Sequence, residues 1–419
     1  MTVLRRLVID ISPLRESRAF RFIFVARLIS LLGIGLLMVA LPYQVYQLTH
    51  SSLHVAGVSV TTALSMFVGS LSGGVLADRH DRRRTIQLAR SLAGLGFLIL
   101  GANALLAHPL LPVIYGAAVL DGVAGGVSSS ALMALTPALV GRERLAAAGA
   151  LITLTTELGT VVTPSVAGVI IATGGVSVTY FVAAAATAVT VTLFQEVGAH
   201  PPTGSVHEPP LRALLTGMRF AVTHQMVRGA LLVGLAVMLV SGPMVLLPAY
   251  NDTVLGAGSG VLGLLYGAPA AGALIGLFTS GWTGRVRRNG RALLLSVALL
   301  PVALIVVGAG GTTVLAVLGL AGFGLGRAVN DTFRFALLQQ HTPDELRGRV
   351  SSLWLVQAVS GTAVGSLVAG LLGNFFRADT ALFIYGCAAA VLGVLLCAVL
   401  RPVWTSTVHT AEPVADRGK

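Results

Sequence analysis

The chain has 419 residues, of which 55% are hydrophobic and only 11% are charged, and its mean hydropathy is +0.86. A soluble domain cannot bury that much apolar surface, so the composition excludes an ordinary globular fold and predicts a membrane protein. The net charge of +12 would suit a nucleic-acid-binding protein, but such a protein gathers its basic residues on one soluble face, and here they fringe a series of apolar segments.

The chain begins with a basic lead, residues 1–21, which contains five arginines ahead of a long apolar run. This arrangement is similar to the start of a signal peptide. The run from Phe22 to Tyr46 is, however, too long for a cleaved segment and lacks a small-x-small cleavage site. It is therefore predicted to be a retained membrane span.

Twelve apolar segments follow one another along the chain, and a spanning helix needs about 20 mostly apolar residues. Their expected bounds are 22–47, 54–76, 86–106, 111–139, 147–173, 177–198, 226–250, 260–281, 292–308, 312–337, 350–373 and 380–400. A polar linker with two Pro-Pro pairs, 199–225, separates an N-terminal half (22–198) from a C-terminal half (226–400), and a polar tail occupies 401–419. The predicted fold is an all-α integral membrane protein with twelve transmembrane helices in two six-helix halves.

The basic residues alternate between successive loops. Every other loop has no Arg or Lys, with Arg377 as the single exception. The remaining segments carry two to five basic residues each, and they are the lead, 77–85, 140–146, 199–225, 282–291 and 341–349. Because basic loops stay on the cytoplasmic side of a membrane, both termini are predicted to be cytoplasmic. An even number of spans agrees with that orientation.

A short, densely charged stretch, residues 74–86, joins the second and third spans. One interpretation is a basic cytoplasmic loop of the kind that any multispan protein has. The other is a conformational latch, in which the carboxylate of Asp78 at a helix end pairs with nearby arginines in only one of two states. The latch residues under this interpretation are Gly74, Asp78, Arg79, Arg83 and Arg84.

The chain also repeats itself at an offset of 206 residues. This shift aligns Pro42 with Pro248, Arg79 with Arg285, Arg82 with Arg288, Thr136-Pro137 with Thr342-Pro343, and Gly159 with Gly365. Parallel halves related by an axis along the membrane normal are one way in which transporters are built. The substrate site is then expected near the membrane midplane, between the halves.

Acidic residues inside spans are costly and are functional hypotheses by default. Glu157, about midway along the fifth span, is the leading proton-coupling candidate, and a structural alternative pairs it with Arg27 or Arg327. Asp121 in the fourth span is the second candidate. The repeat maps Asp121 onto Arg327, so these two charges are expected to face each other across the cavity, either as a structural ion pair or in a transport role.

Basic residues inside spans provide the substrate-binding candidates. Arg327, Asp331 and Arg334 are spaced i, i+4, i+7 in the tenth span and so share one helix face. Arg327 and Asp331 are expected to bind substrate, because the deep Arg327 would attract an anion, whereas Arg334 is expected to snorkel to the interface. Arg27, about one turn inside the first span, is the third candidate, with snorkelling as its alternative.

The charged stretch resembles the loop signature of the major facilitator transporters, in the order Gly-x-x-x-Asp-Arg-x-x-x-Arg-Arg from Gly74 to Arg84. Asp81 stands where that signature usually has Gly, and it adds a second possible partner for an arginine. The resemblance implies the major facilitator fold, which is also built from two parallel six-helix halves.

Longer segments resemble the enterobactin exporter family and cover nearly the whole chain. They are Arg21-Phe22 with Val25 to Ser30, Met66 to Gly69, Gly73 to Arg79, Leu135 to Glu143, Ala172 to Val176, Thr342-Pro343, Gly348-Arg349 and Leu353-Trp354. This resemblance implies an inner-membrane exporter of a catecholate siderophore that is driven by proton influx. Glu157 stands where a basic residue is expected in that family, and the Arg327 face is more charged than expected.

Three other functions compete with siderophore export. A broad drug or macrolide exporter is the main alternative, although such a site would favour few charges and more aromatic residues than the 6% found here. A non-transporting sensor or scaffold would carry a soluble output domain, and an enzyme would show a catalytic motif, neither of which the sequence contains. The expected partners are a small-molecule substrate, protons and membrane lipids, without nucleic acid, cofactor or metal, and the chain is expected to act as a monomer.

Overall fold

The computed structural model describes residues 12–140, 144–198, 210–279, 289–343, 346–400 and 404. Its secondary structure within these ranges is entirely helical. The elements are α1 (Ser12–Glu16), α2 (Arg18–Thr49), α3 (Ser52–Arg79), α4 (Arg82–Ala104), α5 (Leu111–Val140), α6 (Leu145–Leu193), η3 (Phe194–Glu196), α7 (Pro210–Thr223), α8 (Gln225–Val240), η4 (Gly242–Leu246), α9 (Leu247–Thr253), α10 (Ser259–Phe278), α11 (Asn289–Gly310), α12 (Thr313–His341), α13 (Arg347–Phe375) and α14 (Ala378–Val399).

Eleven helices in the described part of the chain are long and apolar enough to cross a membrane. The expected fifth and sixth spans both lie in α6, which is broken at Gly175 by a φ of 82°, a conformation that favours glycine. The expected seventh span is formed by α8, η4 and α9 in succession. Because α6 contains two of the expected spans, the eleven helices account for all twelve. The predicted all-α membrane fold is confirmed.

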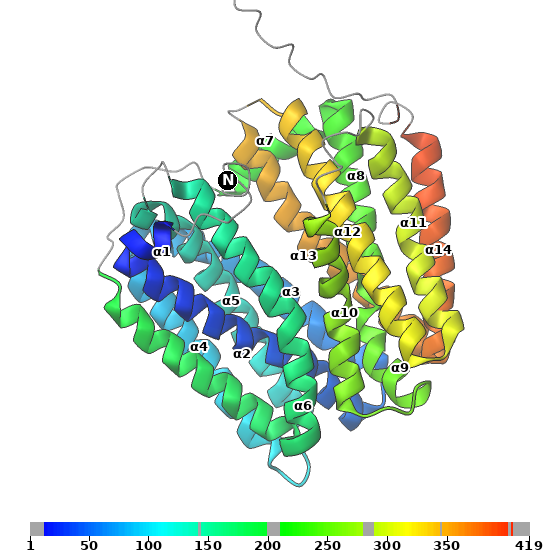
Figure 1. Ribbon diagram of the computed structural model, residues 1–419, viewed down its shortest axis with the longest axis horizontal. Coiled ribbons are helices and arrows are strands. Elements are labelled where there is room, and N and C mark those ends of the chain that lie inside the picture. The colour runs from blue at the N-terminus through cyan, green and yellow to red at the C-terminus, as the bar shows by residue number, and fades with distance from the viewer. Residues whose placement is uncertain are drawn as a thin grey trace, which may run out of the picture.

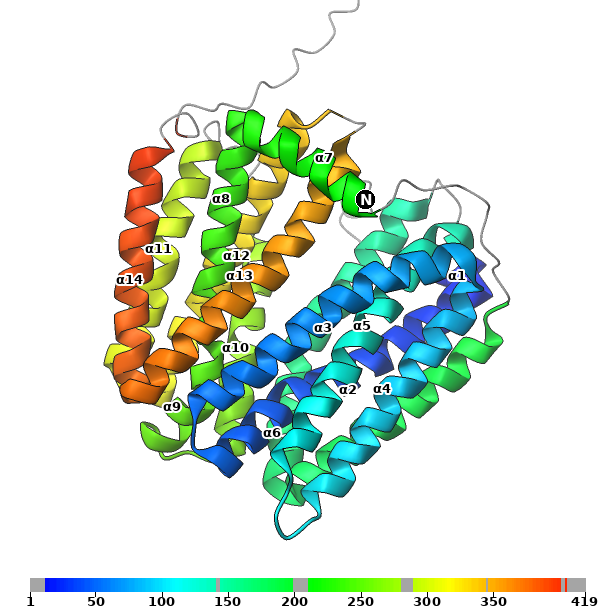
Figure 2. The same ribbon diagram turned by 180° about the vertical axis from the view of Figure 1, so that it is seen from behind.

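The helices form two bundles that lean against each other (Figure 1). Helices α2 to α6 pack together in the first bundle, and helices α8 to α14 pack together in the second. The bundles meet at one end, where α6 contacts α10 and α3 contacts α13, and they diverge toward the other end, where α1 and α7 lie (Figure 2). We call these the narrow end and the wide end of the molecule.

Glycines bring the two bundles close together at the narrow end. A Cβ atom on Gly168 of α6 would lie 2.6 Å from the carbonyl oxygen of Ser259 at the start of α10. A Cβ atom on Gly370 of α13 would lie 2.5 Å from the Cβ of Ala56 on α3. Small residues permit this approach because membrane helices associate through close packing of their backbones.

Within the first bundle, α3 and α5 also pack through glycines. A Cβ atom on Gly122 would lie 2.5 Å from the carbonyl oxygen of Thr62, and one on Gly126 would clash with the carbonyl of Met66. The sequence marks this contact through the small-xxx-small spacing of Gly122 and Gly126. The contact fixes the rotation of α5, and thereby the direction in which Asp121, the residue before Gly122, leaves the helix.

Candidate functional site

A cavity of about 220 Å³ lies inside the first bundle, between α2, α3, α4, α5 and the end of α6. We call it the N-half cavity. Ile34 of α2 and Met66 of α3 line it and are 44% and 38% exposed. Its wall combines apolar residues with three charged side chains and five hydroxyl side chains: Arg27, Arg90, Asp121, Ser30, Thr62, Ser128, Ser129 and Thr190.

Arg27 reaches from α2 across the cavity wall to α6. Its Nη2 donates a hydrogen bond of 2.9 Å to Thr156 Oγ1, while its Nε is buried without a hydrogen-bond partner. The side chain therefore lines the cavity, and the alternative in which it snorkels to the interface is not what the structure shows. Thr156 precedes Glu157, whose side chain lies outside the described residues, so the expected pairing of Glu157 with Arg27 or Arg327 stays a prediction.

Arg90 of α4 is a charged residue of this cavity that the sequence analysis did not include among the candidates. Its Nε donates a hydrogen bond of 2.9 Å to Ser128 Oγ on α5. Its guanidinium also interacts electrostatically with the carboxylate of Asp121. The signal was present in the sequence, because Arg90 interrupts an otherwise apolar span in the same way as Arg27 does.

Asp121 does not form an ion pair with Arg327, so of the two alternatives that the repeat left open, the structural ion pair is absent from this conformation. No ion pair joins them among the described residues, and each has an opposite charge within its own bundle. Arg90 faces Asp121 in the first bundle, and Asp331 lies one helical turn from Arg327 in the second. The nearby counter-charges remove the electrostatic reason for an ion pair between the halves in this conformation.

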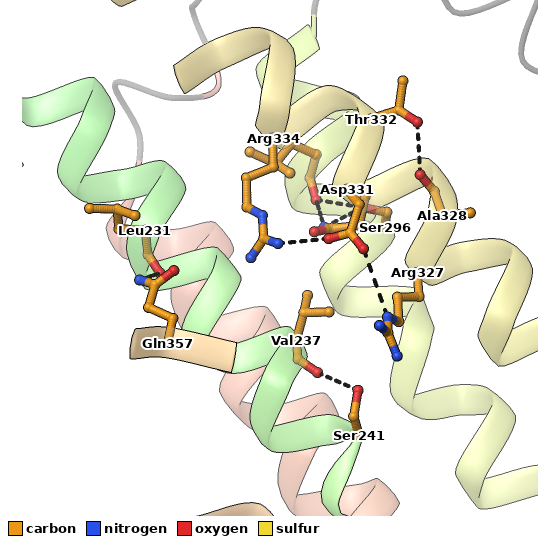
Figure 3. A network of polar contacts seen from close by, with 12 residues as sticks. Leu231, Val237, Ser241, Ser296, Arg327, Ala328, Asp331, Thr332, Arg334 and Gln357 are labelled. Atoms are coloured by element: carbon orange, nitrogen blue, oxygen red, sulfur yellow. Dashed lines mark hydrogen bonds and ion pairs between the residues drawn. The ribbon is translucent and has the colours of Figure 1, made fainter. Parts of the chain in front are cut away.

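The three charges of α12 form a connected group, as their spacing predicts (Figure 3). The carboxylate of Asp331 lies between the two arginines, with Oδ2 3.7 Å from Arg327 Nε and Oδ1 2.7 Å from Arg334 Nη2. The Arg327 side chain is 47% exposed, whereas the Arg334 side chain is fully buried. A ligand can therefore reach Arg327 and also Asp331, which is 31% exposed, but not Arg334.

Arg334 does not snorkel to the interface, so that expectation was wrong. Its guanidinium carbon lies 3.6 Å from the centre of the Trp354 ring on α13. The other side of its guanidinium rests against Gly234 of α8, where a Cβ atom would clash with Nη1. The ion pair with Asp331 and the aromatic face of Trp354 compensate for burial of the charge inside the bundle.

Asp81 is the one residue at which the charged stretch departs from the transporter signature, and the structure shows its role. It is the N-cap of α4, where its Oδ1 accepts hydrogen bonds from the backbone N–H groups of Arg83 (2.8 Å) and Arg84 (3.3 Å). Asp is among the preferred N-cap residues because its side chain satisfies helix donors that have no partner inside the helix. Its carboxylate therefore caps the start of α4 and forms no ion pair with an arginine side chain among the described residues.

The latch candidates are held on a hairpin between α3 and α4 at the wide end. Arg82 anchors this hairpin, since its Nη1 donates a hydrogen bond of 2.9 Å to the carbonyl of Ala134 on α5. The candidates Asp78, Arg79 and Arg84 are exposed and form no side-chain hydrogen bond or ion pair with any described residue. The Nε atom of Arg83 is buried without a hydrogen-bond partner. A Cβ atom on Gly74 would meet nothing within 4 Å.

Comparison with known proteins identifies the family that this chain matches. Residues 23–359 match the family described as Major Facilitator Superfamily. The chain is 41% identical over 394 residues to a protein named enterobactin exporter EntS from Shigella boydii serotype 18, and 40% identical to its namesake from Escherichia coli O1:K1 / APEC. Each alignment covers 94% of both chains.

Solved structures share the fold at low sequence identity. A POT family transporter in complex with 5-aminolevulinic acid aligns with a TM-score of 0.75 and 13% identity, covering 92% of this chain and 97% of its own. A bacterial homologue of the iron transporter ferroportin in an inward-facing state aligns with a TM-score of 0.67 and 16% identity, covering 90% and 98%. At these identities the likeness concerns the fold alone.

Proposed function

Because this chain belongs to the Major Facilitator Superfamily, we propose that it exports a catecholate siderophore of the enterobactin type across the bacterial inner membrane. Transport proceeds by alternating access and is driven by proton influx. The observation that carries this proposal is the 41% identity to an enterobactin exporter over 94% of both chains.

The charges of both bundles support an anionic substrate. The described wall of the N-half cavity carries two arginines and one aspartate, and the charged face of α12 likewise carries two arginines and one aspartate. Each group thus has one positive charge in excess. Catecholate siderophores are large, aromatic and able to carry negative charge, so they suit these sites better than a cationic drug does.

The proposal assigns roles to the charged candidates. Arg327, Asp331 and Arg27 form the substrate contacts, because the two arginines attract anionic groups and Asp331 holds Arg327 in place. Glu157 and Asp121 are the proton-coupling residues, because a carboxyl group inside the membrane can exchange a proton during the cycle.

The predicted orientation of the chain places the wide end on the cytoplasmic side of the membrane. Both termini lie in the cytoplasm under the positive-inside rule, so the wide end opens toward the cytoplasm and this conformation loads substrate. The carboxylate of Asp78, which pairs with no described residue, fits a latch that is released in this state. It would gain its partner when the wide end closes, and a contact that forms in only one state biases the equilibrium between the two.

A gene-deletion experiment tests the proposed function. Cells that lack the protein should accumulate siderophore inside and secrete less of it during iron starvation, and expression of the protein from a plasmid should restore secretion. The main alternative, a drug or macrolide exporter, predicts a different result. In that case the deletion leaves siderophore secretion normal and makes the cells sensitive to drugs.

A further inference from the structure

The N-half cavity holds hydrogen-bond donors that no described residue uses. Arg27 Nε and Ser30 Oγ are both buried and have no hydrogen-bond partner. The two terminal nitrogens of Arg90 form no hydrogen bond with any described residue, since only its Nε is engaged, by Ser128. Buried polar groups in proteins are nearly always hydrogen-bonded, so several unused donors around one cavity indicate a ligand that supplies acceptors.

Ser30 shows most clearly that the cavity is built for a ligand. The residue is only 7% exposed. A serine inside a helix usually donates to the carbonyl four residues earlier, which for Ser30 is Ala26. Ser30 Oγ forms no such bond and has no other hydrogen-bond partner. The hydroxyl of Ser30 is thus left unsatisfied at the cavity wall, where it is available to an incoming oxygen atom.

The size and the apolar part of the wall restrict what the cavity can hold. Its volume of about 220 Å³ lies below the range of roughly 300–1,000 Å³ that accommodates a whole drug-sized ligand. Apolar side chains complete the wall, among them Leu31, Ile34 and Phe194. The cavity therefore fits one small, partly apolar group that carries oxygen atoms, and not a complete siderophore.

We propose that the N-half cavity is a substrate subsite that binds a single catechol ring of the exported siderophore. Arg90, Arg27 and Ser30 donate to the two ring oxygens, and the apolar wall packs against the face of the ring. This inference rests on the proposed export function, because the ring is taken to be a catechol from the proposed substrate. It adds Arg90 and Ser30 as substrate contacts that were not among the candidates from the sequence.

Asp121 also lines the subsite, where its carboxylate is the counter-charge of Arg90. It is the acidic group on the described wall, and it interacts with Arg90 without a hydrogen bond to any described residue. A ring bearing a phenolate oxygen would replace Asp121 as the counter-charge of Arg90. Substrate and Asp121 therefore compete for one arginine, which places the ring and a proton-coupling candidate in the same cavity.

The test uses the full-length protein in lipid nanodiscs and 2,3-dihydroxybenzoate as the probe, with benzoate as the comparison compound. Isothermal titration calorimetry gives the Kd of each. Arg90→Gln should raise the Kd of the probe at least tenfold, since hydrogen bonds to charged groups are strong, and Ser30→Ala should raise it about threefold. Arg377→Gln removes one positive charge outside the cavity and should leave the Kd unchanged.

Ser30→Ala separates a ligand contact from a structural role. Because Ser30 Oγ has no partner inside the protein, its removal should not lower the thermal unfolding midpoint, although it weakens binding of the probe. The subsite is overturned if Arg90→Gln and Ser30→Ala both bind the probe as the wild type does, or if benzoate binds as tightly as 2,3-dihydroxybenzoate.

Failure of the subsite and failure of the proposed function give different results. If the deletion strain secretes siderophore normally while binding of the probe still requires Arg90 and Ser30, the cavity is a catechol-binding site but siderophore export is wrong. If the deletion abolishes secretion while both variants bind the probe normally and restore secretion, export stands and the subsite is wrong.

Discussion

Ser259 Oγ donates a hydrogen bond of 3.2 Å to the carbonyl oxygen of Gly168, and this bond joins the two bundles at the narrow end. Both residues are in helices that cross the membrane, α10 and α6. The contact depends on the absence of a side chain at Gly168, because a Cβ atom there would lie 2.6 Å from the backbone oxygen of Ser259. Backbone contact therefore closes the narrow end at this position.

Gly168→Ala should push the narrow end open. The added methyl group meets backbone atoms that cannot rotate away, so the equilibrium should shift toward the state in which this end is separated, and transport should fall by about tenfold, which corresponds to roughly 1.4 kcal/mol. Spin labels at the exposed residues His108 and Asp252 would report the change as a longer distance. Gly260→Ala is the matched control, because a Cβ atom there meets nothing within 4 Å. Equal behaviour of the two variants would contradict this account of the contact.

The hairpin contains two aspartates with different expected roles. Asp78→Asn should abolish transport without preventing membrane insertion, because it removes the charge that pairs in only one of the two states. Asp81→Asn should retain transport, since Asn caps a helix about as well as Asp does and the capping bonds to Arg83 and Arg84 are preserved. Efflux assays at matched protein abundance make the comparison. Wild-type efflux by Asp78→Asn would remove Asp78 from the mechanism.

The two ion pairs of Asp331 should differ in importance for stability. Asp331→Asn leaves the fully buried Arg334 without its counter-charge, which should lower the free energy of unfolding by about 2 kcal/mol. Arg327→Gln removes a half-exposed arginine, and the cost should be below about 1 kcal/mol. Thermal unfolding of the purified variants in one detergent tests this order, and equal midpoints would show that Asp331 does not stabilise Arg334.

Most of the fold could be predicted from the hydropathy pattern because each span must satisfy its own backbone hydrogen bonds in the bilayer. The predicted bounds of the second span, 54–76, fall inside α3 (Ser52–Arg79), and the predicted loop at 174–176 contains the break at Gly175. The division of the seventh span into α8, η4 and α9 was not predicted, although the sequence carries its signal: Pro243 and Pro248 stand at the second position of η4 and of α9.

The site could be predicted only in part, since a sequence identifies charges within spans but not their partners. The contact among Arg327, Asp331 and Arg334 follows from helix spacing alone. The partner of Arg334, Trp354, lies on another helix and has no local signal. Arg90 was missed because its role depends on Ser128 and Asp121, which the packing of α4 against α5 brings to the same cavity.

Glu157 is expected to couple transport to protons. Glu157→Gln should bind siderophore normally but fail to export it against a gradient, because the amide cannot exchange a proton. Substrate binding to the purified variant and proton-driven uptake into inverted vesicles would separate the two properties. If vesicles with Glu157→Gln accumulate siderophore at the wild-type rate, Glu157 is not the proton site.

Transport by the purified protein in liposomes tests the central claim most directly. Wild-type protein is reconstituted, a proton gradient is imposed, and movement of a catecholate siderophore is measured beside that of a macrolide, with protein-free liposomes as the control. We expect siderophore to move against its own gradient only while the proton gradient lasts, and the macrolide to remain at the level of the protein-free control. Proton-driven movement of the macrolide without movement of the siderophore would contradict the account.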